Sequence, residues 1–240
     1  MQEVFDFPIT PKYSFDNFVV CSGNRAAYHF ARQLAEEDGE NLLYIYGPPG
    51  SGKTHLLLAL GTMLGSKEGA TTPAPSISFK EIDDIYHGIY PAEDVSKLAE
   101  RFRGSALLLI DDLHLIPDNA NVKVELWQLF NDFYTAGKKI VVTGLYPPKE
   151  LPHLDGHLVS RLLWGLVAKM DTSDDDSRRM IMQKLAADRQ IRIPDDVIDY
   201  LLVHARRDIP SLTEALEWIR RLSFATQKKV TVRLAREALG

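Results

Sequence analysis

The sequence has a single cysteine, Cys21, and no run of about 18 apolar residues. One cysteine excludes an intramolecular disulfide and a zinc site made of several cysteines. Without a long apolar run, we expect no membrane-spanning helix and no membrane contact. The first residues also lack the basic and apolar regions of a signal peptide. These absences together favour a cytoplasmic protein.

The sequence also has no excess of basic over acidic residues. The chain has 28 Lys and Arg against 33 Asp and Glu, which gives a formal net charge of −5. Proteins whose main task is to coat nucleic acid carry a basic surface instead. The charge therefore argues against that class, although it permits a local basic patch.

Short apolar segments alternate with helical patterns over the first 170 residues. Segments that are apolar throughout are typical of strands in a parallel sheet buried on both faces. We predict an α/β domain with helices on both faces of such a sheet. The predicted strands are 42–46, 76–79, 106–110, 139–143 and 166–170, and the predicted helices are 23–37, 54–64, 82–90, 92–103 and 122–137.

The pattern changes after Met170, where only helices are predicted. They cover 173–189, 195–206, 210–227 and 232–239. We therefore predict two domains, an α/β domain over 1–170 and a small all-helical lid over 171–240. A ligand is expected between them, because clefts between domains are frequent binding sites.

One segment matches the P-loop motif G-x-x-x-x-G-K-[ST] at every position, and an apolar strand precedes it while a helix follows. In such a loop the glycines let backbone N–H groups approach phosphate oxygens, and the helix N-terminus faces the same anion. The lysine neutralises phosphate charge, and the last hydroxyl ligates Mg²⁺. We predict that ATP or ADP binds with Mg²⁺ at Gly47-Pro48-Pro49-Gly50-Ser51-Gly52-Lys53-Thr54.

Polar residues follow later strands in the order that a P-loop site requires. Asp111 and Asp112 directly follow the strand 106–110, which we expect to neighbour the P-loop strand. We predict that Asp111 holds Mg²⁺, directly or through water, and that Asp112 orients or deprotonates an attacking water. Thr143, at the end of 139–143, is a candidate contact to the γ-phosphate or that water. Arg161 precedes the last strand and is a candidate arginine finger for a neighbouring subunit.

Taken together, these motifs resemble the AAA+ ATPases, and among them the family of the bacterial replication initiator DnaA. The resemblance runs from Pro11 to Leu239 and rests on a series of short signatures in the same order as in the family. These are 11–20 (PKYSFDNFVV), 47–55 (GPPGSGKTH), 109–112 (LIDD), 136–143 (AGKKIVVT), 147–151 (PPKEL), 160–166 (SRLLWGL) and 191–197 (IRIPDDV).

The resemblance implies roles for further residues. The lead-in that contains Phe18 closes over the adenine, and His55 belongs to the nucleotide-binding signature. Arg161 takes the position of the arginine finger. The segment 82–103 is similar to a helix pair with which initiators hold single-stranded DNA, so its basic side chains are candidate phosphate contacts, namely Lys97, Arg101 and Arg103.

The sequence also departs from the initiators. It ends at Gly240 with the lid, so we expect no helix-turn-helix domain and no sequence-specific binding of duplex DNA. No helicase-interaction domain precedes Phe5, which makes the chain similar to the Hda-like branch of the family. In the lid, Pro210 stands where the family has the arginine that senses the γ-phosphate. Arg206 or Arg207 is a candidate substitute, and both nucleotide discrimination and hydrolysis depend on this point.

The resemblance implies a regulator of chromosomal replication initiation that contacts a DnaA-type partner in a nucleotide-dependent way. Self-association through the AAA+ interface is a related expectation, and the isolated chain should hydrolyse ATP slowly. The segment Gln2–Phe7 is a candidate clamp-binding peptide, or else packs on its own domain. Two alternatives stay open: an autonomous ATPase that loads or remodels a helicase on single-stranded DNA, and a nucleotide-bound adaptor without turnover.

Overall fold

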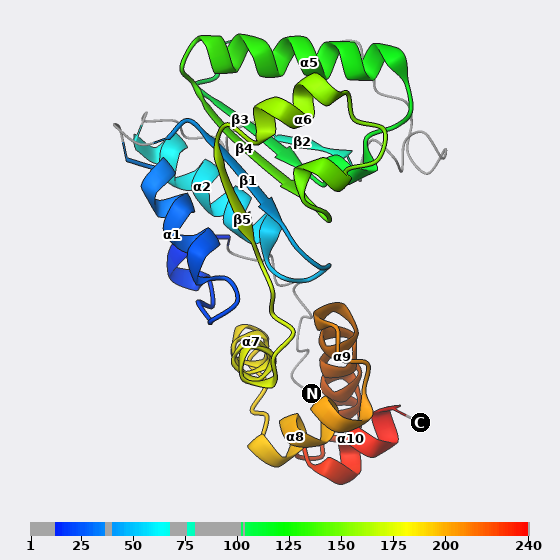
Figure 1. The fold of residues 1–240 in the computed structure, drawn as a ribbon. Coiled ribbons are helices and arrows are strands. Elements are labelled where there is room, and N and C mark those ends of the chain that lie inside the picture. The colour runs from blue at the N-terminus through cyan, green and yellow to red at the C-terminus, as the bar shows by residue number, and fades with distance from the viewer. Residues whose placement is uncertain (1–12, 37–39, 68–75, 80–101, 103, 240) are drawn as a thin grey trace. The chain divides into compact units, whose positions relative to one another are not determined.

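The computed structural model describes residues 13–36, 40–67, 76–79, 102 and 104–239. It consists of two compact units, of which one covers Ser14–Thr172 and the other contains the chain from Ser173 onward (Figure 1). We call them the ATPase unit and the helical unit. Within the described ranges, no helix is long and apolar enough to cross a membrane. The predicted helices 82–90 and 92–103 fall almost entirely outside these ranges.

The ATPase unit is built on one parallel sheet of five strands in the order β2-β3-β4-β1-β5. All five strands are predicted from the sequence, with ends that agree or differ by one residue. Their bounds are β1 Leu42–Tyr46, β2 Ser76–Ser78, β3 Leu107–Asp111, β4 Lys139–Gly144 and β5 Leu166–Lys169.

The order of the strands corrects one expectation. The strand that ends in Asp111 does not neighbour the P-loop strand, because β4 lies between β3 and β1. In the register of β1 with β4, Ile45 pairs with Thr143. The end of β4 is therefore placed between the P-loop and the acidic end of β3, which gives Thr143 a central position.

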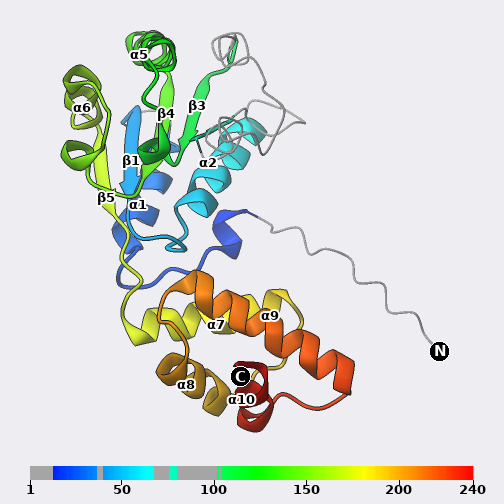
Figure 2. The same cartoon turned by 90° about the vertical axis from the view of Figure 1, so that its right-hand side faces the viewer.

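Helices cover both faces of the sheet, and the alternation of side chains along each strand explains this. In β1, Leu42 and Tyr44 belong to one buried cluster, whereas Leu43 and Ile45 belong to the other. The first cluster packs under α5 (Ala120–Thr135) and α6 (Gly156–Leu162), and the second under α1 (Arg25–Leu34) and α2 (Lys53–Lys67) (Figure 2). The sheet is thus buried on both faces, as its apolar strands predict.

Helix α6 is not predicted from the sequence. It has only seven residues and begins with glycine, so its helical pattern is weak. The side chain of Asp155 caps it by accepting from the backbone N–H of His157 at 2.7 Å. Leu158 and Leu162, four residues apart, anchor it to the sheet. The 3₁₀ turns among the described residues are likewise unpredicted, namely Phe15–Asn17, Leu113–Leu115 and Pro148–Glu150.

The helical unit contains the four helices that the sequence predicts, with small shifts at their ends. They are α7 (Asp175–Asp188), α8 (Asp195–His204), α9 (Ile209–Thr226) and α10 (Val232–Leu239). Side chains cap three of them: Asp174 accepts from Ser177 N, Asp208 from Ser211 N, and Thr231 from Leu234 N. One apolar cluster, which includes Ile198 and Leu212, forms the core of this unit.

Candidate nucleotide-binding site

The P-loop connects the end of β1 at Tyr46 to the start of α2 at Lys53. Its backbone requires glycine. Gly50 and Gly52 have φ of 75° and 96°, values that residues with a side chain rarely adopt. A Cβ atom on Gly47 would lie 2.1 Å from the carbonyl oxygen of Met170. The loop therefore curls tightly against the end of β5, and any side chain at Gly47 would displace it.

The polar groups of the loop suit an anionic ligand. Lys53 is only 7% exposed, and its Nζ donates to the carbonyl oxygens of Gly47 at 2.8 Å and Pro48 at 3.0 Å. The backbone N–H of Ser51 donates to the same Pro48 carbonyl at 3.3 Å, whereas Ser51 Oγ is buried without a hydrogen-bond partner among the described residues. A buried ammonium and an orphaned hydroxyl at a helix N-terminus fit a phosphate group.

Burial lowers the pKa of Lys53, and the negative charges of Asp112 and Asp111 oppose that effect. Burial disfavours the charged ammonium, so an anion beside it would stabilise the site. Pro49, the remaining residue of the motif, is exposed and has no polar side chain.

Asp111 is the point where three segments meet. Its Oδ2 accepts a hydrogen bond from Thr54 Oγ1 at 2.8 Å, and its Oδ1 accepts one from Thr143 Oγ1. The backbone N–H of Asp112 in turn donates to Thr143 Oγ1 at 2.9 Å. Thr54 and Asp111, the two predicted Mg²⁺ ligands, are thus adjacent. Carboxylate and hydroxyl oxygens are suitable ligands for that cation.

Thr143 is fully buried, and its hydroxyl connects the two carboxylate-bearing residues. The hydroxyl proton is donated to Asp111 while the oxygen accepts from the backbone of Asp112. In this arrangement Thr143 orients the acidic pair. The predicted contact of Thr143 with a γ-phosphate or water has no counterpart in these hydrogen bonds and stays a prediction.

Asp112 has a left-handed backbone, with φ of 56° and ψ of 44°, and it begins the 3₁₀ turn Leu113–Leu115. Aspartate tolerates this conformation better than most residues. The turn brings His114 back towards Asp112, with 3.9 Å between His114 Nδ1 and Asp112 Oδ1. That distance is too long for a hydrogen bond. No role is predicted for His114 from the sequence. The one signal in the sequence is its position three residues after Asp111.

His114 is mostly buried, and its Nδ1 has no hydrogen-bond partner within the described chain. Burial lowers its pKa, with a further lowering by Lys53, while Asp112 and Asp111 act in the opposite direction. The folded protein therefore favours the neutral imidazole. A histidine whose folded pKa is lowered contributes stability above its unfolded pKa of about 6.5, and that contribution is lost as the pH falls below it.

We expect His114→Gln to reduce the acid sensitivity of the ATPase unit. Between pH 7.5 and pH 5.5 the melting temperature should fall more steeply in the parent than in this variant, because only the parent must keep a buried imidazole neutral. An NMR titration of the His114 ring should give a midpoint below 6.5. Equal slopes in the two proteins, with a midpoint at or above 6.5, would contradict the expectation.

Phe18 and His55 lie side by side next to the P-loop. Their rings are 5.2 Å apart in an edge-to-face arrangement, and a Cβ atom on Gly52 would lie 3.1 Å from the Phe18 ring. Phe18 also stacks on Tyr28 at 5.8 Å, and His55 Nε2 is 2.9 Å from the carbonyl oxygen of Ser14. The rings of Phe18, His55 and Tyr28 thus form an aromatic wall beside the loop. Tyr28 is a member that sequence reasoning missed.

Arg161 lies on the last turn of α6, and its described side-chain contacts are with aromatic rings and not with the P-loop or the acidic pair. Its guanidinium lies over the rings of Trp127, Tyr134 and Trp164. Among the described residues, no contact joins it to Lys53 or to the acidic pair. The structure brings together the P-loop, the acidic pair, Thr143, Phe18 and His55, and it leaves Arg161 in separate surroundings.

In the helical unit, Pro210 is in the first turn of α9. Arg207, one candidate substitute for the missing lid arginine, forms an ion pair with Asp175 at the start of α7. Arg178 donates to the same carboxylate at 3.0 Å. Arg207 is thus engaged within the helical unit. The segment Gln2–Phe7 and the basic residues Lys97, Arg101 and Arg103 lie outside the described residues.

Comparison with known proteins agrees with this geometry. The family model of the bacterial DnaA ATPase domain matches residues 9–169, and that of the lid domain of Hda matches residues 175–239. Domain III of the replication initiation protein DnaA from Thermotoga maritima is 30% identical, with a TM-score of 0.81, over 97% of this chain and 98% of that one.

Two further structures extend the comparison. AMPPCP-bound DnaA from Aquifex aeolicus is 27% identical, with a TM-score of 0.73, over 90% of this chain and 68% of that one. The RuvB Holliday junction branch migration motor from Thermotoga maritima is 16% identical, with a TM-score of 0.69, over 95% of this chain and 71% of that one, so it shows the shared fold alone. With a DnaA-type ATPase domain matched over most of its length and followed by an Hda-type lid, the chain belongs to the DnaA family of AAA+ ATPases.

Proposed function

We propose that this protein is a nucleotide-dependent regulator of the initiation of chromosomal replication, which acts by contacting an initiator-type AAA+ partner. The observation that carries the proposal is the succession of two family matches, the DnaA ATPase domain over 9–169 and the Hda lid over 175–239. The first match supports a role related to replication initiation, and the second supports the Hda-like type. We place the domain boundary after Met170.

ATP or ADP is the proposed ligand of the P-loop. Lys53 and the N-terminus of α2 would bind the phosphates, and the aromatic wall with Phe18 and His55 would lie beside the base. Mg²⁺, when bound, would neutralise phosphate charge, and Thr54 and Asp111 are its proposed ligands. One DnaA structure contains AMPPCP and a second contains AMPPCP and single-stranded DNA, which supports the binding of ATP or ADP.

Two residues have proposed roles in hydrolysis. Asp112 would accept a proton from, or orient, the attacking water, held by the hydrogen bond between its backbone and Thr143. Arg161 would act in trans on the nucleotide of a neighbouring AAA+ subunit, either an initiator or a second copy of this chain. Hydrolysis would then need an assembled interface, so the isolated chain should be slow.

The test is binding and phosphate release with an initiator of the DnaA family from the same cell. We expect the chain to bind the ATP-loaded initiator with an affinity that changes at least tenfold when ADP replaces ATP in the chain, and to accelerate phosphate release from the initiator. Calorimetry and a single-turnover assay measure the two effects. The proposal fails if neither nucleotide supports binding, or if ATPase activity of the chain alone rises on single-stranded DNA, as for a helicase loader.

A second candidate function is an adaptor that keeps its nucleotide without turnover. It is favoured by Pro210, which cannot donate a charge to a γ-phosphate, and by the ion pair that holds Arg207 on Asp175. ADP that stays bound through purification, with no phosphate release in the presence of the initiator, would support this candidate over the first.

A further inference from the structure

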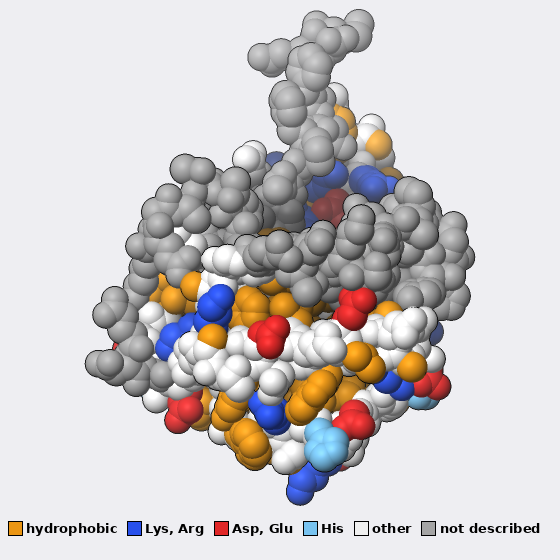
Figure 3. All heavy atoms as spheres, turned by 90° about the horizontal axis from the view of Figure 1, so that it is seen from above, with side chains coloured by type: hydrophobic (Ala, Val, Ile, Leu, Met, Phe, Trp, Pro, Cys, Tyr) orange, Lys and Arg blue, Asp and Glu red, His pale blue; other side chains and the backbone are white. Residues whose placement is uncertain are grey.

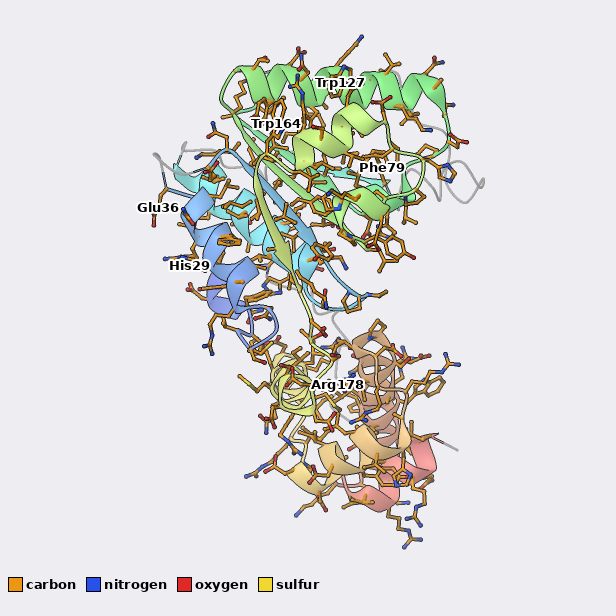
Figure 4. All side chains as sticks on the ribbon, viewed as in Figure 1. His29, Glu36, Phe79, Trp127, Trp164 and Arg178 are labelled. Atoms are coloured by element: carbon orange, nitrogen blue, oxygen red, sulfur yellow. The ribbon has the colours of Figure 1, made fainter. Side chains whose placement is uncertain are left out.

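The guanidinium of Arg161 is surrounded by aromatic rings. Its Cζ atom lies 4.8 Å from the ring centroid of Trp127, 5.4 Å from that of Tyr134 and 5.4 Å from that of Trp164. All three distances are within the range of a cation–π contact. Figure 4 labels the two tryptophans, one on α5 and the other just after α6. We call these three rings the aromatic shelf.

The shelf is held in place by its own packing. Trp127 and Tyr134 are seven residues apart on α5 and therefore share a face of that helix. The Tyr134 ring stacks on buried Phe130 at 6.3 Å, and the Trp164 ring is 5.7 Å from Tyr134. The shelf is thus fixed to the core of the ATPase unit through α5, and its outer ring, Trp164, remains 58% exposed.

In the part of the chain that the structure describes, the guanidinium of Arg161 contacts these rings and forms no ion pair with a carboxylate. Contact with aromatic rings leaves a guanidinium in a different chemical state from contact with a carboxylate. A carboxylate would occupy the N–H groups of the guanidinium, whereas a ring face attracts the charge and leaves those N–H groups, which lie in the guanidinium plane, free for oxygen acceptors. An arginine held by rings is oriented but keeps its donors available.

We propose that Trp127, Tyr134 and Trp164 are positioning residues, which hold Arg161 ready to donate to the phosphate of a nucleotide on a partner subunit. This inference rests on the proposed trans role of Arg161. Figure 3 views the molecule from above, the side on which Figure 1 shows α5, and hydrophobic side chains lie between charged ones on that face. Tryptophan, tyrosine and arginine are also the residues most enriched where protein interfaces concentrate their binding energy. Preorganisation of this kind lowers the entropy lost when the arginine engages.

The kinetic test uses Trp127 and Tyr134, which are less exposed than Trp164. We expect Trp127→Leu or Tyr134→Leu each to lower the maximal rate of initiator ATP hydrolysis about two- to fivefold, which is the value of one exposed cation–π contact. The double variant should lose about tenfold. The initiator concentration at half-maximal rate should not change, and Trp127→Phe, which keeps a ring face, should restore most of the rate.

The control is Trp218→Leu in the helical unit, which removes a ring 6.0 Å from Arg221 and should leave the rate unchanged. The position of the Arg161 guanidinium over the rings is checked separately by NMR. The Arg161 Hε resonance should show an upfield ring-current shift in the parent, reduced in Trp127→Leu and retained in Trp127→Phe. Melting temperatures show that each variant folds.

The outcomes separate the two proposals. If Arg161→Ala leaves stimulation intact, the trans role itself fails. If Arg161→Ala abolishes stimulation while Trp127→Leu loses the ring-current shift but keeps or gains rate, the shelf does not position the arginine and this inference is overturned. A gain in rate would mean that the rings restrain Arg161 instead.

Discussion

Arg161→Ala is expected to lower the ATP hydrolysis that we propose this chain to stimulate on a DnaA-type initiator by about 10³-fold, the low end of the effect of an arginine finger. The guanidinium would stabilise negative charge that develops on the transferred phosphoryl group, and alanine offers no substitute. A single-turnover assay with ATP-loaded initiator measures the loss. Binding of nucleotide to the variant itself should not change, because no described contact joins Arg161 to the P-loop residues.

Arg221→Ala is the matched control. Arg221 also lies over a tryptophan ring, that of Trp218, but in the helical unit. It should leave stimulation unchanged, so a loss specific to Arg161 cannot be ascribed to the removal of any surface arginine. Full turnover by the dilute chain alone, unaffected by Arg161→Ala, would contradict a role in trans.

Much of the ATPase unit could be predicted because its signals are local. Strand β1 is apolar over its whole length and β3 is apolar up to Asp111. The P-loop motif sets its own backbone, as the positive φ of Gly50 and Gly52 shows. The four helices of the lid follow from periodicity and from caps such as Asp208. Each of these features depends on residues that are close to one another in the sequence, which is the range over which a sequence pattern is informative.

The remaining features depend on residues far apart in the chain. The position of β4 between β1 and β3 is decided by strand pairing, and any of these apolar strands could pair with any other. The hydrogen bond from Thr143 to Asp111 follows from that order, across 32 residues. The aromatic shelf joins Arg161 to Trp127, 34 positions earlier, through a helix too short to be recognised. Single motifs therefore predict the candidate site residues, but not the contacts that hold these residues together.

Lys53→Ala is expected to weaken ATP binding about 100-fold, because a charge-assisted contact to phosphate contributes up to about 3 kcal/mol. At an ATP concentration 100 times the parent dissociation constant, ligand stabilisation should fall from about 2.7 to about 0.4 kcal/mol. The ATP-induced rise in melting temperature should then nearly disappear. Calorimetry gives the affinity directly.

The fold should survive this change, which separates loss of binding from loss of structure. Alanine removes the hydrogen bonds of Nζ to Gly47 and Pro48 but also removes a buried charge, and these effects offset each other. Lys138→Ala is the control, since Lys138 Nζ likewise donates to a backbone carbonyl, that of Ser105, at 2.8 Å. It should retain parental ATP affinity. Unchanged affinity in Lys53→Ala would mean that the P-loop does not bind the nucleotide phosphates. The proposed nucleotide-dependent regulation would then have no support from this site.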